Sequence, residues 1–229
     1  MTLAIMTYNI RHGAGMDNRW NPARTADVVR KYSPDVLCLQ EVDRHTGRSF
    51  GADEPAMLAH FLDPLGHWAF VKSIDFQGGE YGNALLAREE PLSVIRCPLP
   101  GVHEGRSVLV CEFEAFAVAT LHASLHEETR LASAEAVRRL ARNFGKPLFI
   151  TGDWNARPDS PFLDAMRETF AILSPTDGGT CPADKPRGCI DYVAVDKAHA
   201  DSVRVREAFV ADEPLASDHR PVVVRLELV

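Results

Sequence analysis

The chain has 229 residues, of which 45% are hydrophobic, and its formal net charge is −7. This length and composition predict a folded domain with a sizeable core, and we expect one domain over residues 1–229 because no Gly-, Ser- or Pro-rich linker divides the sequence. The acidic balance argues against tight, non-specific binding to duplex DNA, which depends on Lys and Arg contacts to phosphates.

The N-terminus and the cysteines indicate where in the cell the protein is located. The start, MTLAIMTYNIRHG, lacks the basic region of a signal peptide, and no apolar run approaches the roughly 20 residues that span a bilayer. The cysteines are odd in number, and three lie in apolar runs, which indicates buried thiols in a reducing compartment. Cys181 and Cys189 are a weak alternative disulfide or metal pair. We expect a cytoplasmic protein without an obligate protein partner.

The first half of the chain predicts alternating strands and helices. Residues 3–9 form the first predicted strand, and a helix capped by Asn21 begins at Pro22 and runs through Tyr32, where Ser33-Pro34 ends it. The continuous apolar run over 36–40 is typical of a strand that is covered on both faces. A helix over 54–63 follows, and then strands over 68–73, 83–88, 92–97, 107–113 and 116–123.

The second half of the chain contains the clearest helical pattern, over 127–144, where apolar residues recur at helical spacing. A strand over 147–153 and a helix over 161–170 come next, followed by strands over 190–195, 202–210 and 221–228. Strands dominate, with a few helices between them. The pattern therefore predicts an α/β (α+β) fold of two sheets packed face to face and flanked by helices.

A carboxylate and a carboxamide follow the apolar run LFI in TGDWNARPDS. In a strand, side chains at positions i and i+2 point the same way, so Asp153 and Asn155 are expected to face one site. The alternative is an Asx turn, in which these residues only shape the chain.

Other predicted strands also end or begin at polar residues. Taken singly, each has a structural explanation, such as a solvated carboxylate, a capped turn or a hydrogen-bonded histidine. Their recurrence at corresponding positions favours a shared site instead, because open α/β sheets commonly bind ligands at strand ends. The residues are Asn9, Glu41, His122, Asp191, Asp218 and His219.

Seven segments together resemble a known family. They are MTYNIRHG, LQEVD, YGNALLAR, TLHASLH, TGDWNARPDS, CIDYVAV and ASDHRPVVV. In this order they are similar to the motifs of the endonuclease/exonuclease/phosphatase superfamily, the deoxyribonuclease-like fold, over nearly the whole chain. GDWNA and SDH are specific in combination, whereas YN and QE are weak alone. The resemblance implies a four-layer α/β sandwich of two packed, mainly antiparallel sheets flanked by helices.

The resemblance also implies a phosphoesterase that depends on Mg²⁺ or Mn²⁺. A hard cation held by oxygen ligands neutralises the charge that develops on a phosphate ester during hydrolysis. By the resemblance, Glu41 is the principal metal ligand, Asp218 is a second acidic ligand and Asn9 supports the metal or the phosphate.

The remaining motif residues have catalytic roles in this interpretation. Asp153 is the general base that deprotonates water, and Asn155 holds that water or a phosphate oxygen. His219 contacts a phosphoryl oxygen while Asp191 holds its ring and favours its charged form, and His122 gives a second contact to the developing charge.

The substrate surface is less well defined by the sequence. Arg11 stands where some nucleases of the family carry an acidic residue, and a guanidinium there can bind phosphate but not Mg²⁺. Asn83, in YGNALLAR, is a second candidate substrate ligand. Further candidates for the cleft are His12, Arg44, His45, Arg48, Tyr81 and the substrate loops 73–82 and 98–106.

Three functions remain open at this point. The first is a phosphodiesterase that acts by direct attack of water on a small molecule or lipid headgroup, since neither GxSxG nor a Walker A loop is present. The second is a DNA or RNA nuclease of the same fold, which the acidic balance disfavours. The third is a non-catalytic binding module, which the completeness of the motifs disfavours.

Overall fold

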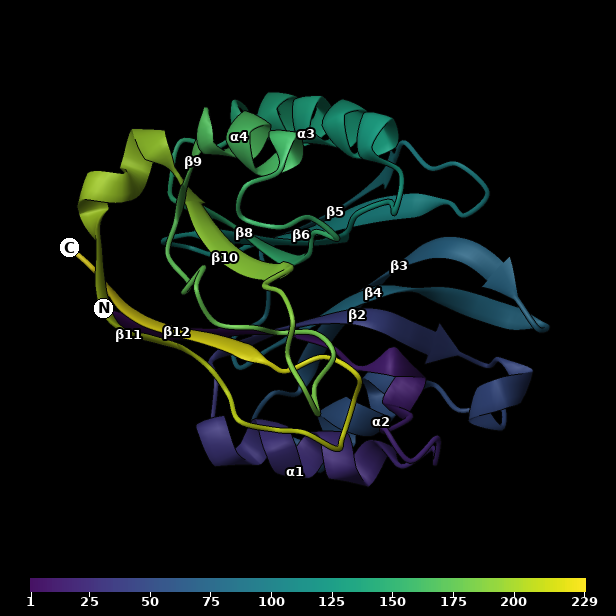
Figure 1. Cartoon of the computed structure of the whole chain (residues 1–229). Helices are drawn as coiled ribbons and strands as arrows, with labels where there is room; N and C mark the ends of the chain where they lie inside the picture. Colours follow the sequence, from purple (N-terminus) through teal and green to yellow (C-terminus); the bar gives the residue numbers. More distant parts are fainter.

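Two six-stranded sheets pack face to face (Figure 1). The computed structural model describes residues 1–229. The strands are β1 Thr2–Asn9, β2 Val36–Arg44, β3 His67–Phe76, β4 Gly79–Ala87, β5 Ser93–Leu99, β6 Arg106–Glu112, β7 Ala117–His122, β8 Leu148–Asp153, β9 Phe170–Ile172, β10 Asp191–Asp196, β11 Val203–Val210 and β12 Val222–Leu228. Their order is β11-β12-β1-β2-β4-β3 in the first sheet and β5-β6-β7-β8-β10-β9 in the second.

Each sheet has one parallel pair at its centre, β1 with β2 and β7 with β8. All other neighbouring strands are antiparallel. A parallel pair needs a crossover connection, and a helix supplies it in both cases. The two crossovers are α1 Pro22–Tyr32 and α3 Glu127–Ala141.

Helices cover the outer faces of both sheets, as Figure 1 shows. α1 and α2 (Glu54–Phe61) pack on the first sheet, and α3 and α4 (Pro161–Arg167) pack on the second. Short 3-10 helices lie at Arg11–Gly13, Gly47–Ser49 and Lys197–Ser202. α1 has the predicted bounds: the Asn21 side chain accepts a hydrogen bond from the Arg24 backbone N–H, and Ser33 ends the helix in a left-handed conformation.

Strand alternation divides the apolar side chains among three cores. On β1, Ile5 points into the core between the sheets, whereas Met6 points into the core beneath α1 and α2. Similarly, Val118 of β7 lies between the sheets, and Ala119 packs beneath α3 and α4. The structure thereby confirms the predicted four-layer sandwich of two mainly antiparallel sheets.

Three helices are shorter than predicted, since α2 ends at Phe61 rather than at residue 63, and α3 and α4 also end early. α3 ends at Ala141, and Phe144 still reaches the core through a turn in which its N–H bonds the Ala141 carbonyl. The prediction of a helix over 161–170 is wrong beyond Arg167, because Phe170 begins the three-residue edge strand β9. So short a strand leaves no period-2 pattern in the sequence to distinguish it from the end of a helix.

The prediction of a loop over 73–82 is also wrong, while the role of this segment in substrate binding stays a prediction. These residues form the β3–β4 hairpin, whose two-residue turn is Gln77-Gly78 with φ values of 47° and 82°. Positive φ at both turn residues is the geometry that matches the twist of paired strands. The second predicted loop is present in shortened form, since residues 100–105 connect β5 to β6.

All five cysteines are free, so Cys181 and Cys189 do not form a disulfide. Cys38, Cys111 and Cys189 are buried, while Cys97 and Cys181 are half-buried. Cys97 lies on the edge strand β5, where one side of the strand has no neighbour. None of the helices has the length and apolar content needed to cross a bilayer.

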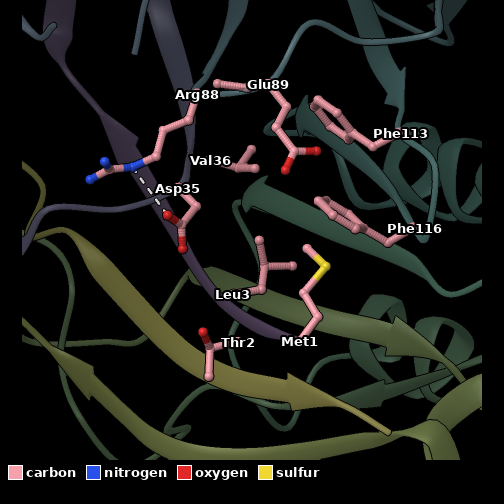
Figure 2. A pocket seen from close by; sticks show the side chains of 10 residues that line it. Met1, Thr2, Leu3, Asp35, Val36, Arg88, Glu89, Phe113 and Phe116 are labelled. Atoms are coloured by element: carbon pink, nitrogen blue, oxygen red, sulfur yellow. Dashed lines mark ion pairs between the residues drawn. The ribbon is translucent and has the colours of Figure 1, made fainter. Parts of the chain in front are cut away.

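A cavity of about 170 Å³ opens at one edge of the sandwich, beside the starts of β1 and β2 (Figure 2). Its lining includes apolar side chains and one ion pair: Leu3, Val36, Phe113, Phe116, Asp35 and Arg88. Because a strand rises about 3.3 Å per residue, the length of β1 separates this cavity from Asn9 by roughly 23 Å. The polar strand ends therefore lie at the opposite edge.

Candidate active site

The polar strand ends converge at one edge of the sandwich. Asn9 ends β1 beside Gln40 of β2, and His122 ends β7 beside Asp153 of β8. Both pairs are parallel, so each brings two carboxyl ends to the same edge. Asp191 begins the antiparallel strand β10 directly opposite Asp153 and reaches this edge from the other direction.

Asn9 joins the two sheets at this edge. Its Nδ2 donates to Glu41 Oε1 and to Asp153 Oδ2, each at 3.0 Å. Its backbone carbonyl accepts a hydrogen bond of 2.7 Å from Ser217 Oγ, which brings the 217–219 segment to the same place. The sequence interpretation assigned Asn9 to metal or phosphate support, and the amide as observed bridges a carboxylate of each sheet.

Glu41 lies in an irregularity of the β2–β4 pairing and has a φ of 57°. A left-handed conformation is uncommon for a residue with a Cβ, and such strain is concentrated at functional sites. Burial raises the pKa of Glu41, and the nearby carboxylates of Asp218 and Asp153 add to the rise, while the hydrogen bond from Asn9 opposes it. The Glu41 carboxylate is therefore held in surroundings that disfavour its charge.

Asp153 and Asn155 share a site, but not for the reason that strand alternation predicts. β8 ends at Asp153, and Asn155 has a φ of 47°, so the two residues do not belong to one strand. The Asn155 backbone N–H donates to Asp153 Oδ1 at 2.9 Å, which is the Asx turn of the alternative interpretation. The turn directs Asn155 Nδ2 to within 3.0 Å of His122 Nε2 and the Ala123 carbonyl.

The His219 ring lies between two carboxylates. Its Nδ1 is 2.9 Å from Asp191 Oδ2, and its Nε2 is 3.6 Å from Asp153 Oδ2. Burial disfavours the charged ring, but the two carboxylates outweigh burial and raise the pKa of His219 well above its ordinary value. The proposed contact between Asp191 and His219 is thus present in the structure.

The His122 ring has the opposite electrostatics. Its Nε2 is 3.4 Å from Asp153 Oδ2, which favours a charged ring, but burial together with the charges of Arg106 and His219 lowers the pKa of His122 to about 4. Arg106 is the last residue of the predicted substrate loop 98–106, but the sequence interpretation gave it no role of its own. Its Nη1 donates to Glu104 Oε1 at 2.6 Å and lies 3.4 Å from His122 Nδ1.

Asp218 and Arg11 lie beside each other at the rim. Arg11 Nε is 3.7 Å from Asp218 Oδ2, and the guanidinium also donates to the Gly15 carbonyl and to Asn18 Oδ1. Both side chains are about one-third exposed, at 31% and 37%. The role of Arg11 as a phosphate ligand stays a prediction.

Asn83 is buried and connects the two sheets. It lies on β4 and donates to the backbone carbonyl of Ser107 on β6 at 3.0 Å, whereas its Oδ1 has no partner. The irregular stretch of β2 that contains Glu41 lies opposite this part of β4. Substrate binding by Asn83 stays a prediction.

The remaining cleft candidates divide into two groups. Arg44 and His45 lie close to Asp53, at 2.7 Å and 3.6 Å. Arg48 instead donates to Asp43, and its guanidinium lies over the Tyr81 ring. Burial lowers the pKa of His12 to about 4, and its Nδ1 has no partner.

Two overlapping groups have the chemistry to hold a divalent cation. Asp153, Asp191 and His219 are buried, with ligand atoms within 4.8 Å of one another. In that group the His219 ring already neutralises the carboxylates. Glu41 forms no ion pair and is repelled by Asp218 and Asp153, so a surplus of negative charge surrounds hard oxygen donors. The Glu41 side of the cluster therefore has the chemistry to hold a hard divalent cation.

A family model described as "Endonuclease/Exonuclease/phosphatase family" matches residues 6–219. The chain is 26% identical over 218 residues to the uncharacterized protein YbhP of Escherichia coli K12, a match that covers 86% of this chain and 85% of YbhP.

Solved structures share the fold. An endonuclease/exonuclease/phosphatase from Beutenbergia cavernae has 25% identity and a TM-score of 0.85, over 99% of this chain and 72% of that one. A mannosyl-6-phosphatase of Bacteroides thetaiotaomicron has 18% identity and a TM-score of 0.76, over 98% of this chain and 99% of that one.

Proposed function

Because the chain belongs to the endonuclease/exonuclease/phosphatase family, we propose that it is a divalent-metal-dependent phosphoesterase that hydrolyses a phosphodiester by direct attack of water. One observation carries the proposal: the Asp153 carboxylate accepts hydrogen bonds from Asn9 and Asn155 and lies within 3.6 Å of a ring nitrogen of both His122 and His219. An acceptor, two imidazoles and an amide thus surround one small volume.

The side chains divide the work according to their charge. Asp153 accepts the proton of the attacking water, and Asn155 orients that water or a phosphate oxygen. His219, kept charged by Asp191, donates to a phosphoryl oxygen where negative charge develops. His122 is neutral and contributes a hydrogen bond rather than a charge.

Glu41 and Asp218 hold the cation in this proposal, and Asn9 orients Glu41. Mg²⁺ takes few protein carboxylates and keeps several waters, so this small donor set is sufficient. When bound, the cation supplies neutralisation of charge on the phosphate oxygens.

The substrate class we favour is a small molecule or a lipid headgroup, because the net charge of −7 opposes association with a long polyanion. A nuclease of the same fold is the alternative. A phosphate monoester is a third substrate class to test, since one structural relative is named a mannosyl-6-phosphatase. A non-catalytic binding module is disfavoured, because the Asp153 cluster is complete.

A phosphoester screen tests the proposal. Plasmid, oligonucleotide, bis-p-nitrophenyl phosphate, p-nitrophenyl phosphate and glycerophosphoinositols are offered to wild type and Asp153→Asn, with Mg²⁺, Mn²⁺ or a chelator. We expect diester turnover that the chelator abolishes and that Asp153→Asn lowers at least about a hundredfold. Asp201→Asn, an exposed change in the 3-10 helix Lys197–Ser202, is the matched control.

The results separate the alternatives. Normal turnover by Asp153→Asn refutes the base assignment, and turnover in chelator refutes the metal requirement. Cleavage of nucleic acid without hydrolysis of small diesters reverses the order of the two substrate classes.

A further inference from the structure

A second cavity, of about 420 Å³, lies beside the candidate active site. Its lining mixes polar and apolar surface and includes two cations, two carboxylates and several glycines. The lining residues used below are Arg157, Asp159, Asp177, Gly178, Gly179 and Arg187.

The cavity adjoins the catalytic residues through both of its walls. Arg157 follows Asn155 by two residues, and Cys189 precedes Asp191 by two. Tyr192 lies between these walls, because its hydroxyl oxygen is 2.7 Å from the Ala156 carbonyl and 2.8 Å from the Cys189 carbonyl, and its single proton can be donated to either. A ligand that fills the cavity would therefore lie next to the group that reacts.

The two arginines of this cavity have no partner within the chain. Neighbouring arginines are paired, such as Arg167 with Asp164 and Arg220 with Asp212. Arg157 and Arg187 form neither an ion pair nor a side-chain hydrogen bond, although both are exposed at the cavity. A Cβ at Gly188 would lie 3.5 Å from Arg157 Nε, so the Arg157 side chain runs along this glycine.

Backbone donors of the same cavity are also free. The N–H groups of residues 176–179 donate no hydrogen bond to the chain, and all four residues line the cavity. Consecutive free amides beside arginines are a chemistry that suits an anion.

The loop that carries Arg187 is fixed to the active site. The N–H groups of Thr180 and Cys181 donate to the Gly188 carbonyl, which closes the loop on itself. At its tip, the Ala183 N–H donates to the Asp218 carbonyl at 2.7 Å, and Arg220 Nε donates to the Ala183 carbonyl at 2.7 Å. The loop is thus held at the same segment that supplies Asp218.

We propose that this Arg157–Arg187 cavity is an anion subsite that binds a second negatively charged group of the substrate, next to the phosphodiester that is cleaved. The proposal rests on the proposed function and narrows its substrate class to diesters that carry a further phosphate or carboxylate. A phosphorylated headgroup and a polynucleotide backbone share this chemistry.

The carboxylates of the cavity make the proposal testable in both directions. Asp159 and Asp177 line it without pairing to either arginine. Removal of an arginine charge weakens anion binding in this cavity, whereas removal of a carboxylate charge strengthens it. A purely structural role for the arginines would not produce opposite effects.

Matched substrates isolate the subsite. Thymidine 5′-(p-nitrophenyl phosphate) and its 3′-phosphorylated form differ by one phosphate. We expect wild type to favour the phosphorylated form by about tenfold in kcat/KM, through a charge-assisted contact. We expect the double variant Arg157→Gln/Arg187→Gln to remove the preference for the phosphorylated form, and Asp177→Asn to increase that preference.

The second pair is glycerophosphoinositol and glycerophosphoinositol 4-phosphate, and Arg142→Gln, an exposed arginine after α3, is the control. A preference that depends on Arg157 and Arg187 in the nucleotide pair indicates a polynucleotide backbone, and one in the inositol pair indicates a headgroup. The absence of such a preference in both pairs overturns the subsite.

A binding measurement separates this inference from the proposed function. Calorimetry with Asp153→Asn compares thymidine 3′,5′-bisphosphate with thymidine 5′-monophosphate and needs no turnover. Tighter binding of the bisphosphate that is lost with Arg157 and Arg187 supports the subsite even if every esterase assay fails. Equal binding of the two nucleotides contradicts it.

Discussion

At the scale of single residues, the position of the Asp153 carboxylate depends on the hydrogen bonds that it accepts from its neighbours. Its Oδ2 accepts a hydrogen bond from Asn9, and its Oδ1 accepts one from the Asn155 backbone, whose φ of 47° is left-handed. Together with the φ of 57° at Glu41, this places two non-glycine residues in conformations that cost about 1–3 kcal/mol each. Two of the non-glycine residues with positive φ thus lie within the proposed site, while others, such as Ser33 and Gln77, lie in turns elsewhere.

Glu54 gives a prediction about pH and folding. It is fully buried, and burial raises its pKa from 4.5 to about 7, although hydrogen bonds from Trp20 and from the Asp43 backbone oppose the rise. A carboxyl group whose pKa is higher in the folded than in the unfolded protein contributes its full stabilisation at pH values below the unfolded-state pKa. This contribution is lost as the pH rises through the folded-state pKa. The wild-type unfolding free energy should fall by about 3 kcal/mol through this group between pH 4.5 and pH 7.

Urea unfolding of wild type and Glu54→Gln at about pH 5 and about pH 8 measures this contribution. The substitution loses a hydrogen bond at both pH values, so only the difference between the two is informative. We expect a smaller fall in the variant, and an equal fall in both proteins would contradict the prediction.

At the scale of elements, the contact between β7 and β8 sets the site. Gly152 has a φ of 134°, and a Cβ built there would lie 1.9 Å from the Leu121 carbonyl oxygen. Only glycine allows the two strands to approach this closely. The next pair in the register is His122 with Asp153, so the same approach brings the imidazole to the carboxylate.

Gly152→Ala should therefore damage both stability and activity. We expect a loss of more than about 3 kcal/mol of unfolding free energy from backbone strain and strand separation. Gly145→Ala is the control, because nothing lies within 4 Å of a Cβ at that position. Thermal unfolding and diester turnover measure the two effects, and a Gly152→Ala protein as stable as the control would contradict the explanation.

Local sequence signals predicted most helices and strands, whereas contacts between residues far apart in the chain could not be predicted from the sequence. Asn21-Pro22 placed the start of α1 because a cap and a helical proline act within one turn. The strand β9 was missed because its three residues pair only with β10, which comes later in the chain.

The candidate site shows the same division. The motifs identified the family and the polar strand ends, and the structure brings Asn9 and Asp153 into contact across 144 positions. The sequence offered the Asn155 turn only as an alternative to a shared strand face, because its choice depends on a local φ. The contact between Arg106 and His122 was not predicted, because it joins residues of two neighbouring strands, β6 and β7.

For the whole molecule, the acidic cluster links stability to metal. Glu41 forms no ion pair and is repelled by Asp153 and by the partly exposed Asp218, whose neighbouring cation is Arg11. Such a cluster destabilises the metal-free protein, and a cation that binds only the folded state reverses the effect. The molecule as a whole should therefore respond to metal in its unfolding temperature.

Thermal unfolding with chelator, Mg²⁺ or Mn²⁺ tests this response. At a hundredfold excess over Kd, we expect metal to stabilise wild type by about 2.7 kcal/mol. Glu41→Gln retains an oxygen that accepts from Asn9, so we expect it to be more stable than wild type in chelator and to lose most of the metal response. A variant stabilised by metal as much as wild type would refute Glu41 as the ligand.

The hydrogen bond between Asn9 and Asp153 has one end in each sheet. The proposed base and the amide that holds it therefore belong to different sheets. A small sliding of one sheet against the other would break this hydrogen bond while both sheets stayed folded. The rate of hydrolysis would then report on the relative position of the two sheets. Mild denaturant or hydrostatic pressure should therefore abolish turnover before circular dichroism detects any loss of β-strand content.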